Sequence, residues 1–169
     1  VPALKIGLLL MFLTLLPSLL VSVTSFTRII VVIGFLKQAL WTKTLPPSQV
    51  IVGLSLFLTL FTMSPVLQQI HTNAVEPYQN DQITDQQAIQ EAIDPVRAFM
   101  ADKTRPKDLK LFLGLTNDKA PEDFESVSSF VLIPAFMLSE LRTAFIMGAM
   151  IYIPFIIIDI VVASLLMSM

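Results

Sequence analysis

Cysteine is absent from this chain of 169 residues, and His71 is its only histidine. Without thiols there is no disulfide framework and no thiolate metal site, and a single histidine disfavours a zinc centre or a His-based catalytic triad. The five glycines are scattered, so no phosphate-binding loop is present, and no nucleophile elbow or HExxH helix occurs. Basic residues do not cluster as a nucleic-acid-binding surface requires. We therefore expect no enzyme, no cofactor, no metal and no nucleic-acid partner.

Charge is also scarce: 14% of residues are charged and 54% are hydrophobic, with a mean hydropathy of +0.75. Soluble domains are about 45–50% apolar and about 25% charged, so this composition predicts a membrane protein. The chain opens on Val1 rather than Met and stops at Met169 within an apolar run. We therefore expect a processed or incomplete chain.

Two uncharged runs near the N-terminus are long enough to be membrane-spanning helices, for which about 20 residues are needed. The first is Ile6–Phe26, after which Arg28 interrupts further apolar sequence. The second is Val50–Leu67, which we expect to end near Pro65. Because the connector Lys37–Gln49 is short, the two helices should form an antiparallel hairpin.

The segment Gln68–Ser129 carries 11 acidic and 6 basic side chains, unlike the apolar sequence on either side. The positive-inside rule places the short connector with Lys37 and Lys43 in the cytoplasm, and Trp41 suits a membrane boundary. The acidic segment, called the insert below, is then predicted to lie in the periplasm.

Helix signals recur within the insert. Thr84 and Gln87 have capping-box spacing before an apolar stripe of helical period, in which Pro95 should cause a kink or a restart. Pro106 is expected to open a second short helix that Gly114 closes. The insert should therefore be folded and helical.

The final stretch, Phe130–Met169, is long enough to cross a bilayer twice. Pro121–Asp123 reads as the first turn of a helix that runs into it, and Gly148 is the expected turn between its two halves. Pro134 and Pro154 have two interpretations. Either they curve the helices around a core, or they leave backbone carbonyls without a helical hydrogen bond, and neighbouring helices or a water-lined cavity then satisfy these carbonyls.

Charged side chains in this final stretch are costly in lipid. Over residues 130–149, nine Val, Leu, Ile or Phe residues contribute about −4 kcal/mol to the free energy of membrane insertion. Glu140 and Arg142 contribute about +6 kcal/mol to the same free energy, so insertion into lipid alone is unfavourable. Residues two apart on a helix do not face each other, so each needs a partner elsewhere. Together with Arg28 and Asp159, they are candidates for inter-helix or inter-subunit ion pairs. The alternative interpretation is a proton or substrate relay.

These features predict an all-α membrane protein in three parts. Residues 1–67 form an N-terminal apolar hairpin, residues 68–129 the acidic helical insert, and residues 130–169 a second, charged apolar hairpin. Such polar-studded hairpins are suited to a helical multi-subunit assembly. At the end of the chain, Met167 and Met169 either fill gaps or contribute to a deformable seal.

Ten collinear motifs cover nearly the whole chain. They are Thr24–Ile30, Leu36–Leu40, Pro46–Val50, Gly53–Thr59, Met63–Val66, Pro95–Met100, Thr104–Arg105, Leu132–Phe136, Ser139–Phe145 and Ile153–Ile160. In these motifs the chain resembles the FliP family, whose members are flagellar type III secretion export-gate proteins. Arg28 within Phe26–Ile29 resembles the flagellar branch, since related injectisome proteins usually carry Lys there.

The resemblance implies a non-catalytic core subunit of the flagellar export gate, located in the bacterial inner membrane at the basal body. It implies self-association, with a pentamer as the family's pattern, and partners of the FliQ and FliR kinds. Unfolded flagellar proteins would pass through the centre. Family members usually continue beyond the position of Met169 into a methionine-rich pore gasket, which leaves Met167 and Met169 as pore-proximal candidates, and they extend upstream of Val1.

Two other functions fit the composition. One is a secondary transporter or proton channel that uses Glu140, Arg142 and Asp159, although no internal repeat is visible. The other is a membrane anchor that presents the acidic insert to a soluble partner.

Overall fold

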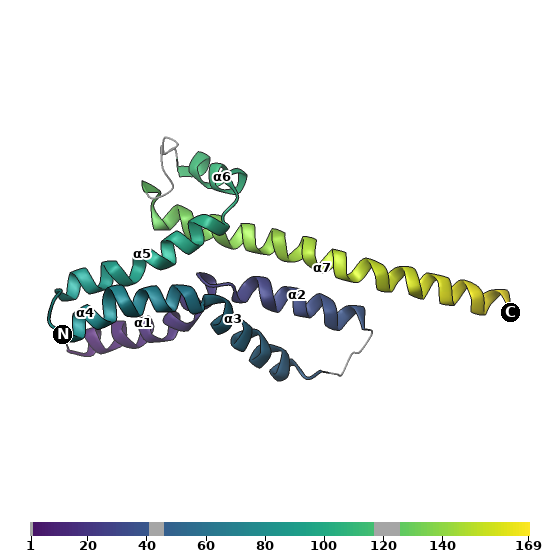
Figure 1. The fold of residues 1–169 in the computed structure, drawn as a ribbon, viewed down its shortest axis with the longest axis horizontal. Helices are drawn as coiled ribbons and strands as arrows, with labels where there is room; N and C mark the ends of the chain where they lie inside the picture. Colours follow the sequence, from purple (N-terminus) through teal and green to yellow (C-terminus); the bar gives the residue numbers. More distant parts are fainter. Residues whose placement is uncertain (1, 41–45, 117–125) are drawn as a thin grey trace.

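The computed structural model describes residues 2–40, 46–116 and 126–169, and within these ranges it contains helices and no strands (Figure 1). This confirms the prediction of a helical membrane protein. The elements are α1 (Pro2–Ser22), α2 (Phe26–Ala39), α3 (Ser48–Ile70), the π-helical turn η1 (His71–Val75), α4 (Glu76–Gln79), α5 (Asp85–Lys103), α6 (Pro106–Thr116) and α7 (Ser129–Ser168).

Three helical segments among the described residues are long and apolar enough to cross a membrane. They are Leu4–Ser22, Ser48–Gln79 and Ser129–Ser168. The first ends where a short bend separates α1 from α2, so the charged residue Arg28 lies on a separate helix. The second begins directly after Pro47.

Helices α2 and α3 pack against each other and run antiparallel. The hydroxyl oxygens of Ser25, just before α2, and Thr62, near the end of α3, lie 2.6 Å apart. The connector residues 41–45, which include Trp41 and Lys43, lie outside the described residues. The chain thus folds back on itself between α2 and α3.

The predicted end of the second apolar helix near Pro65 is wrong. Helix α3 continues through Pro65 to Ile70, and η1 and α4 prolong it to Gln79. A proline removes one helical hydrogen bond, and packing against neighbouring helices compensates for the loss. The wider π-helical turn lies just ahead of Pro77, whose missing amide would otherwise leave the carbonyl of Asn73 unpaired.

The insert is helical, as the sequence predicts. Thr84 and Gln87 form the predicted capping box at the start of α5: the Thr84 hydroxyl accepts from the Gln87 amide at 3.4 Å, and the Gln87 side chain accepts from the Thr84 amide at 2.9 Å. Helix α5 runs through Pro95 without a restart, and α6 begins at Pro106 as predicted.

Two other expectations for the insert have different outcomes. Helix α6 passes Gly114 and ends at Thr116, so the predicted closure at Gly114 is wrong. The predicted first turn at Pro121–Asp123 falls in residues 117–125, outside the described residues.

The predicted turn at Gly148 is wrong, because α7 is one helix of 40 residues. Gly148 instead lies at a close helix contact. The ring of Phe35 in α2 packs over it and also meets Phe145 edge-on, with ring centroids 5.5 Å apart. Since Arg28 contacts Glu140 and Phe35 contacts Gly148, α2 and α7 run parallel side by side (Figure 1).

The hydrophobic core lies where the insert meets the inner half of α7, which we define as residues 129–148. Phe136 and Leu132 on α7 are fully buried, and Phe99 on α5 meets Phe136 with ring centroids 5.8 Å apart. The buried core residues are Met100, Leu109, Leu113, Val127, Val131, Leu132, Ala135 and Phe136. The outer half of α7, residues 149–168, extends beyond this core and contains no buried residue (Figure 1).

A methyl group at Gly148 would overlap Phe35, so Gly148→Ala should destabilise the packing of α2 on α7. A Cβ there would lie closer than 3.0 Å to three ring carbons of Phe35. We expect overpacking to outweigh the gain in helix propensity, with a net loss of about 1 kcal/mol in chemical unfolding.

Gly53→Ala is the matched control for this prediction. Nothing lies within 4 Å of a Cβ at Gly53 in α3, so the higher helix propensity of alanine should make that variant neutral or more stable. Combining Gly148→Ala with Phe35→Leu should recover part of the loss. Equal stabilities of the two single variants would contradict the close contact.

Candidate functional site

Two ion pairs lie where α2, α6 and α7 meet. In the first, Arg28 near the start of α2 donates from Nη2 to Oε1 of Glu140 in α7. The Glu140 side chain is 1% exposed and that of Arg28 is 29% exposed. The Arg28 Nε is buried without a hydrogen-bond partner among the described residues. Among the described residues, Arg28 is the only ion-pair partner of the Glu140 carboxylate.

The second pair joins the insert to α7. Arg142 Nη2 lies 3.1 Å from Oδ1 of Asp108, whose side chain is 2% exposed. The Ser139 hydroxyl donates to the other Asp108 oxygen at 2.8 Å, and it accepts from the Arg105 amide at 3.0 Å. Asp108 in α6 is thus held by a guanidinium and a hydroxyl from the same face of α7.

The two pairs leave α7 on different sides. Glu140 and Arg142 are two residues apart and so cannot face each other; Glu140 meets α2, whereas Arg142 meets α6. We call Arg28, Asp108, Ser139, Glu140 and Arg142 the polar cluster. It ties α2 and α6 to neighbouring positions of α7.

The structure brings together three of the four predicted ion-pair residues. Arg28 and Glu140 pair with each other, and Arg142 pairs with a residue of the insert, all within one chain. Asp159 lies 17 residues beyond Arg142 on the same continuous helix, about 25 Å along its axis. A relay through Glu140, Arg142 and Asp159 would therefore have to cross that length of helix.

The pore-proximal candidates lie at the far end of α7. Met167 is 83% exposed, and Met169 follows the last helical residue, fully exposed. Neither is near the polar cluster, since Glu140 lies 27 residues before Met167 on the same helix.

Sequence reasoning missed Asp108 and Ser139. An acid in the first turn of a short helix normally reads as a solvated group that complements the helix dipole. The available signal was on α7, where Ser139 and Arg142 are spaced i, i+3 and so share one face. That face could be read as polar, but the identity of its partner depends on tertiary packing.

A further contact fixes the start of α7. Arg97 in α5 donates to the Ser129 hydroxyl and, at 2.5 Å, to the carbonyl of Val127. The Ser128 hydroxyl accepts from the amide of Phe130 at 3.3 Å and caps the helix. The insert therefore contacts α7 in two places, at the first turn of α7 and at the polar cluster.

Within the described ranges, no group of three or more His, Cys, Asp or Glu side chains is placed to hold a metal ion. The ion pairs join α2 and α6 to α7, which is one of the three helical segments long and apolar enough to span a membrane. This combination defines a helical membrane protein whose buried charges join its helices.

Comparison with known proteins shows to which family of membrane proteins the chain belongs. The family model described as the FliP family matches residues 9–169, and the chain belongs to that family. It is 50% identical over 157 residues to the flagellar biosynthetic protein FliP of Pectobacterium carotovorum subsp. carotovorum, which covers 93% of this chain and 61% of the relative.

Two further relatives carry the same name. The flagellar biosynthetic protein FliP of Bacillus subtilis (strain 168) is 44% identical, over 98% of this chain and 75% of the relative. That of Aquifex aeolicus (strain VF5) is 42% identical, over 100% of this chain and 72% of the relative. The chain thus spans 61–75% of the length of these three relatives, and it belongs to a family of flagellar biosynthesis.

Proposed function

We propose that this chain is a core subunit of the flagellar type III export gate. In this proposal several copies, five by the family's pattern, assemble with FliQ-like and FliR-like subunits in the bacterial inner membrane. The insert lies in the periplasm, and unfolded flagellar proteins pass through the assembly. The subunit is non-catalytic and contributes packed helices to a conduit.

The observation that carries the proposal is the outer half of α7. It extends away from the insert (Figure 1), and all its residues are exposed except 151, 152, 155, 156 and 159, which are half-buried along one face. Its exposed large apolar residues are Met150, Ile153, Ile157, Ile158, Ile160, Val161, Val162, Leu165, Leu166 and Met167. A helix that is apolar all round requires apolar surroundings.

Protein neighbours suit this half better than lipid. Asp159 lies within it, and acidic groups in spanning helices generally face protein or water rather than acyl chains. Neighbouring copies would cover the apolar side chains. In this arrangement the methionines at the end of α7 lie near the axis of the assembly, where an adaptable thioether surface suits varied cargo.

The polar cluster supports the proposal in a different way. Because its ion pairs close within one chain, each copy can keep α2, α6 and α7 together before it meets a neighbour. The apolar outer half of α7 then remains available for contacts between copies.

Native mass spectrometry of the complex extracted from membranes tests the proposal. We expect several copies of the chain together with FliQ-like and FliR-like subunits. Ile157→Asn, which places an amide on the exposed outer half of α7, should reduce the assembled fraction and motility. Ile89→Asn in α5 is the matched control, since Ile89 is 61% exposed and Ile157 is 56% exposed.

A monodisperse monomer in lipid would contradict the proposal. So would equal assembly of the Ile157→Asn and Ile89→Asn variants. Proton flux through vesicles that contain this chain alone would favour a proton channel or secondary transporter instead.

A further inference from the structure

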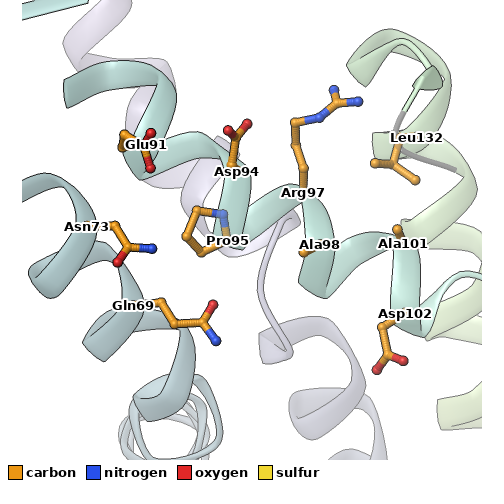
Figure 2. A pocket seen from close by; sticks show the side chains of 10 residues that line it. All are labelled: Gln69, Asn73, Glu91, Asp94, Pro95, Arg97, Ala98, Ala101, Asp102 and Leu132. Carbon is orange, nitrogen blue, oxygen red and sulfur yellow. The ribbon is translucent and has the colours of Figure 1, made fainter. Parts of the chain in front are cut away.

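A groove of about 770 Å³ lies between α5 and the helix formed by α3 and η1 (Figure 2). Gln69 and Asn73 project into it from α3 and η1, and Leu132 of α7 closes one end. It belongs to neither the polar cluster nor the outer half of α7. The contacts described so far therefore give the groove no role.

The α5 wall of the groove combines an apolar floor with an acidic rim. Pro95 of α5 and Leu132 of α7 are the buried apolar residues of its lining, whereas Ala98, Glu91 and Asp94 are exposed. Glu91, Asp94 and Ala98 are spaced i, i+3 and i+7, so they share one face of α5. Glu91 and Asp94 form no ion pair among the described residues.

The other charged residues of the groove are already engaged. Lys103 donates to Asp102 at 2.7 Å, and this lysine lowers the pKa of the Asp102 carboxyl through the hydrogen bond and its charge. Arg97 donates its guanidinium hydrogens to Ser129 and Val127 at the start of α7. The groove therefore presents two adjacent carboxylates that form no ion pair among the described residues, of which Asp94 also accepts a hydrogen bond from Gln90 at 2.6 Å.

That surface matches a lysine-bearing helix. A lysine places its alkyl stem on apolar surface and its ammonium at the polar edge. Two lysines three residues apart would match two carboxylates three residues apart, because both pairs have about the same 5–6 Å spacing between Cβ atoms.

The same chain carries such a pair on α6. Lys107 and Lys110 are exposed, are spaced i, i+3, and form no ion pair among the described residues. In Figure 1, α6 lies on the other side of α5 from α4, and neither lysine pairs with Glu91 or Asp94 of its own chain. The matching surfaces can therefore meet between copies.

We propose that Lys107 and Lys110 of one copy bind the groove at Glu91 and Asp94 of the next copy. The two surfaces are different patches of one molecule, so the contact is heterologous and generates a ring when its rotation closes. This inference rests on the proposed self-association and specifies which faces of the insert meet. It gives the assembly a direction around its axis.

Cross-linking between copies tests the contact, since the chain contains no cysteine. Two differently tagged full-length copies are expressed together, one with Asp94→Cys and the other with Lys107→Cys, and membranes are treated with an oxidant. We expect a cross-link that carries both tags. Ile89→Cys paired with Lys107→Cys is the control, because Ile89 lies on the opposite face of α5 from Asp94.

Charge reversal provides the second measurement. Here cysteines are placed on the outer half of α7, and the fraction of chains that they cross-link measures assembly. Lys107→Glu with Lys110→Glu should lower the cross-linked fraction about fivefold or more. Adding Glu91→Lys with Asp94→Lys to the same chain should restore it. That restoration also shows that the reversed chains fold.

Four outcomes would overturn this inference: a cross-link no stronger than the Ile89 control, an equally strong product from Asp94→Cys alone, no loss on reversal, or no restoration. If the unmodified chain still assembles in native mass spectrometry, these outcomes leave the proposed function in place. An unmodified chain that stays monomeric overturns both.

Discussion

Replacing Arg28 with methionine should lower the free energy of unfolding by about 3–5 kcal/mol, because it leaves a buried charge without compensation. Arg28 supplies the only ion pair of Glu140 among the described residues, and the Glu140 side chain is 1% exposed. Chemical unfolding in detergent, followed by the loss of helical circular dichroism, measures the change. Assembly and motility should fall with it.

The reverse replacement is the informative control for this pair. Glu140→Met leaves Arg28 without its partner, but the Arg28 side chain is 29% exposed and can keep part of its hydration. The free energy of unfolding should therefore fall less than in Arg28→Met. The Arg28→Met and Glu140→Met double variant removes both charges and should be close to the wild type or more stable. Equal losses in all three variants would show that packing rather than charge holds α2 to α7. Glu140→Gln with unchanged assembly and motility would also count against the pair.

Replacing Arg142 with methionine should weaken the insert's attachment to α7, with a loss of about 3 kcal/mol. Asp108 is 2% exposed, and without Arg142 it keeps only the Ser139 hydroxyl as a side-chain partner among the described residues. Its carboxylate would then be buried with too little compensation. Amide hydrogen exchange should rise in α6 more than in α2, because α6 is held at this point.

Two variants separate charge from geometry at this pair. Arg142→Lys keeps the charge but loses the planar guanidinium, so it should retain part of the stability. Asp108→Asn combined with Arg142→Met removes both charges and should recover most of the loss. An exchange increase spread evenly over α2 and α6 would contradict a local role for the pair.

The helices and their starts could be predicted from the sequence because local chemistry determines them. The capping box at Thr84 and the helix start at Pro106 are both found where they were predicted. The spacing of Glu140 and Arg142 alone showed that each needs a partner outside its own helix. The structure supplies both partners, and one of them is on the insert.

Features that depend on neighbouring helices could not be predicted in this way. Gly148 and Pro65 are helix breakers by local propensity, yet both lie inside helices. At Gly148 the missing side chain makes room for Phe35, which no pattern within α7 reveals. The burial of Asp108 could not be predicted for the same reason, since it depends on where α6 packs.

The uninterrupted length of α7 has a consequence for the membrane around the protein. Forty helical residues extend about 60 Å, twice the roughly 30 Å of a bilayer's hydrocarbon layer. Tilt cannot absorb a mismatch of that size, since spanning helices rarely tilt beyond about 40°. Part of this helix must therefore lie outside the hydrocarbon layer, and the buried contacts of its inner half with the insert show which part the chain itself can cover.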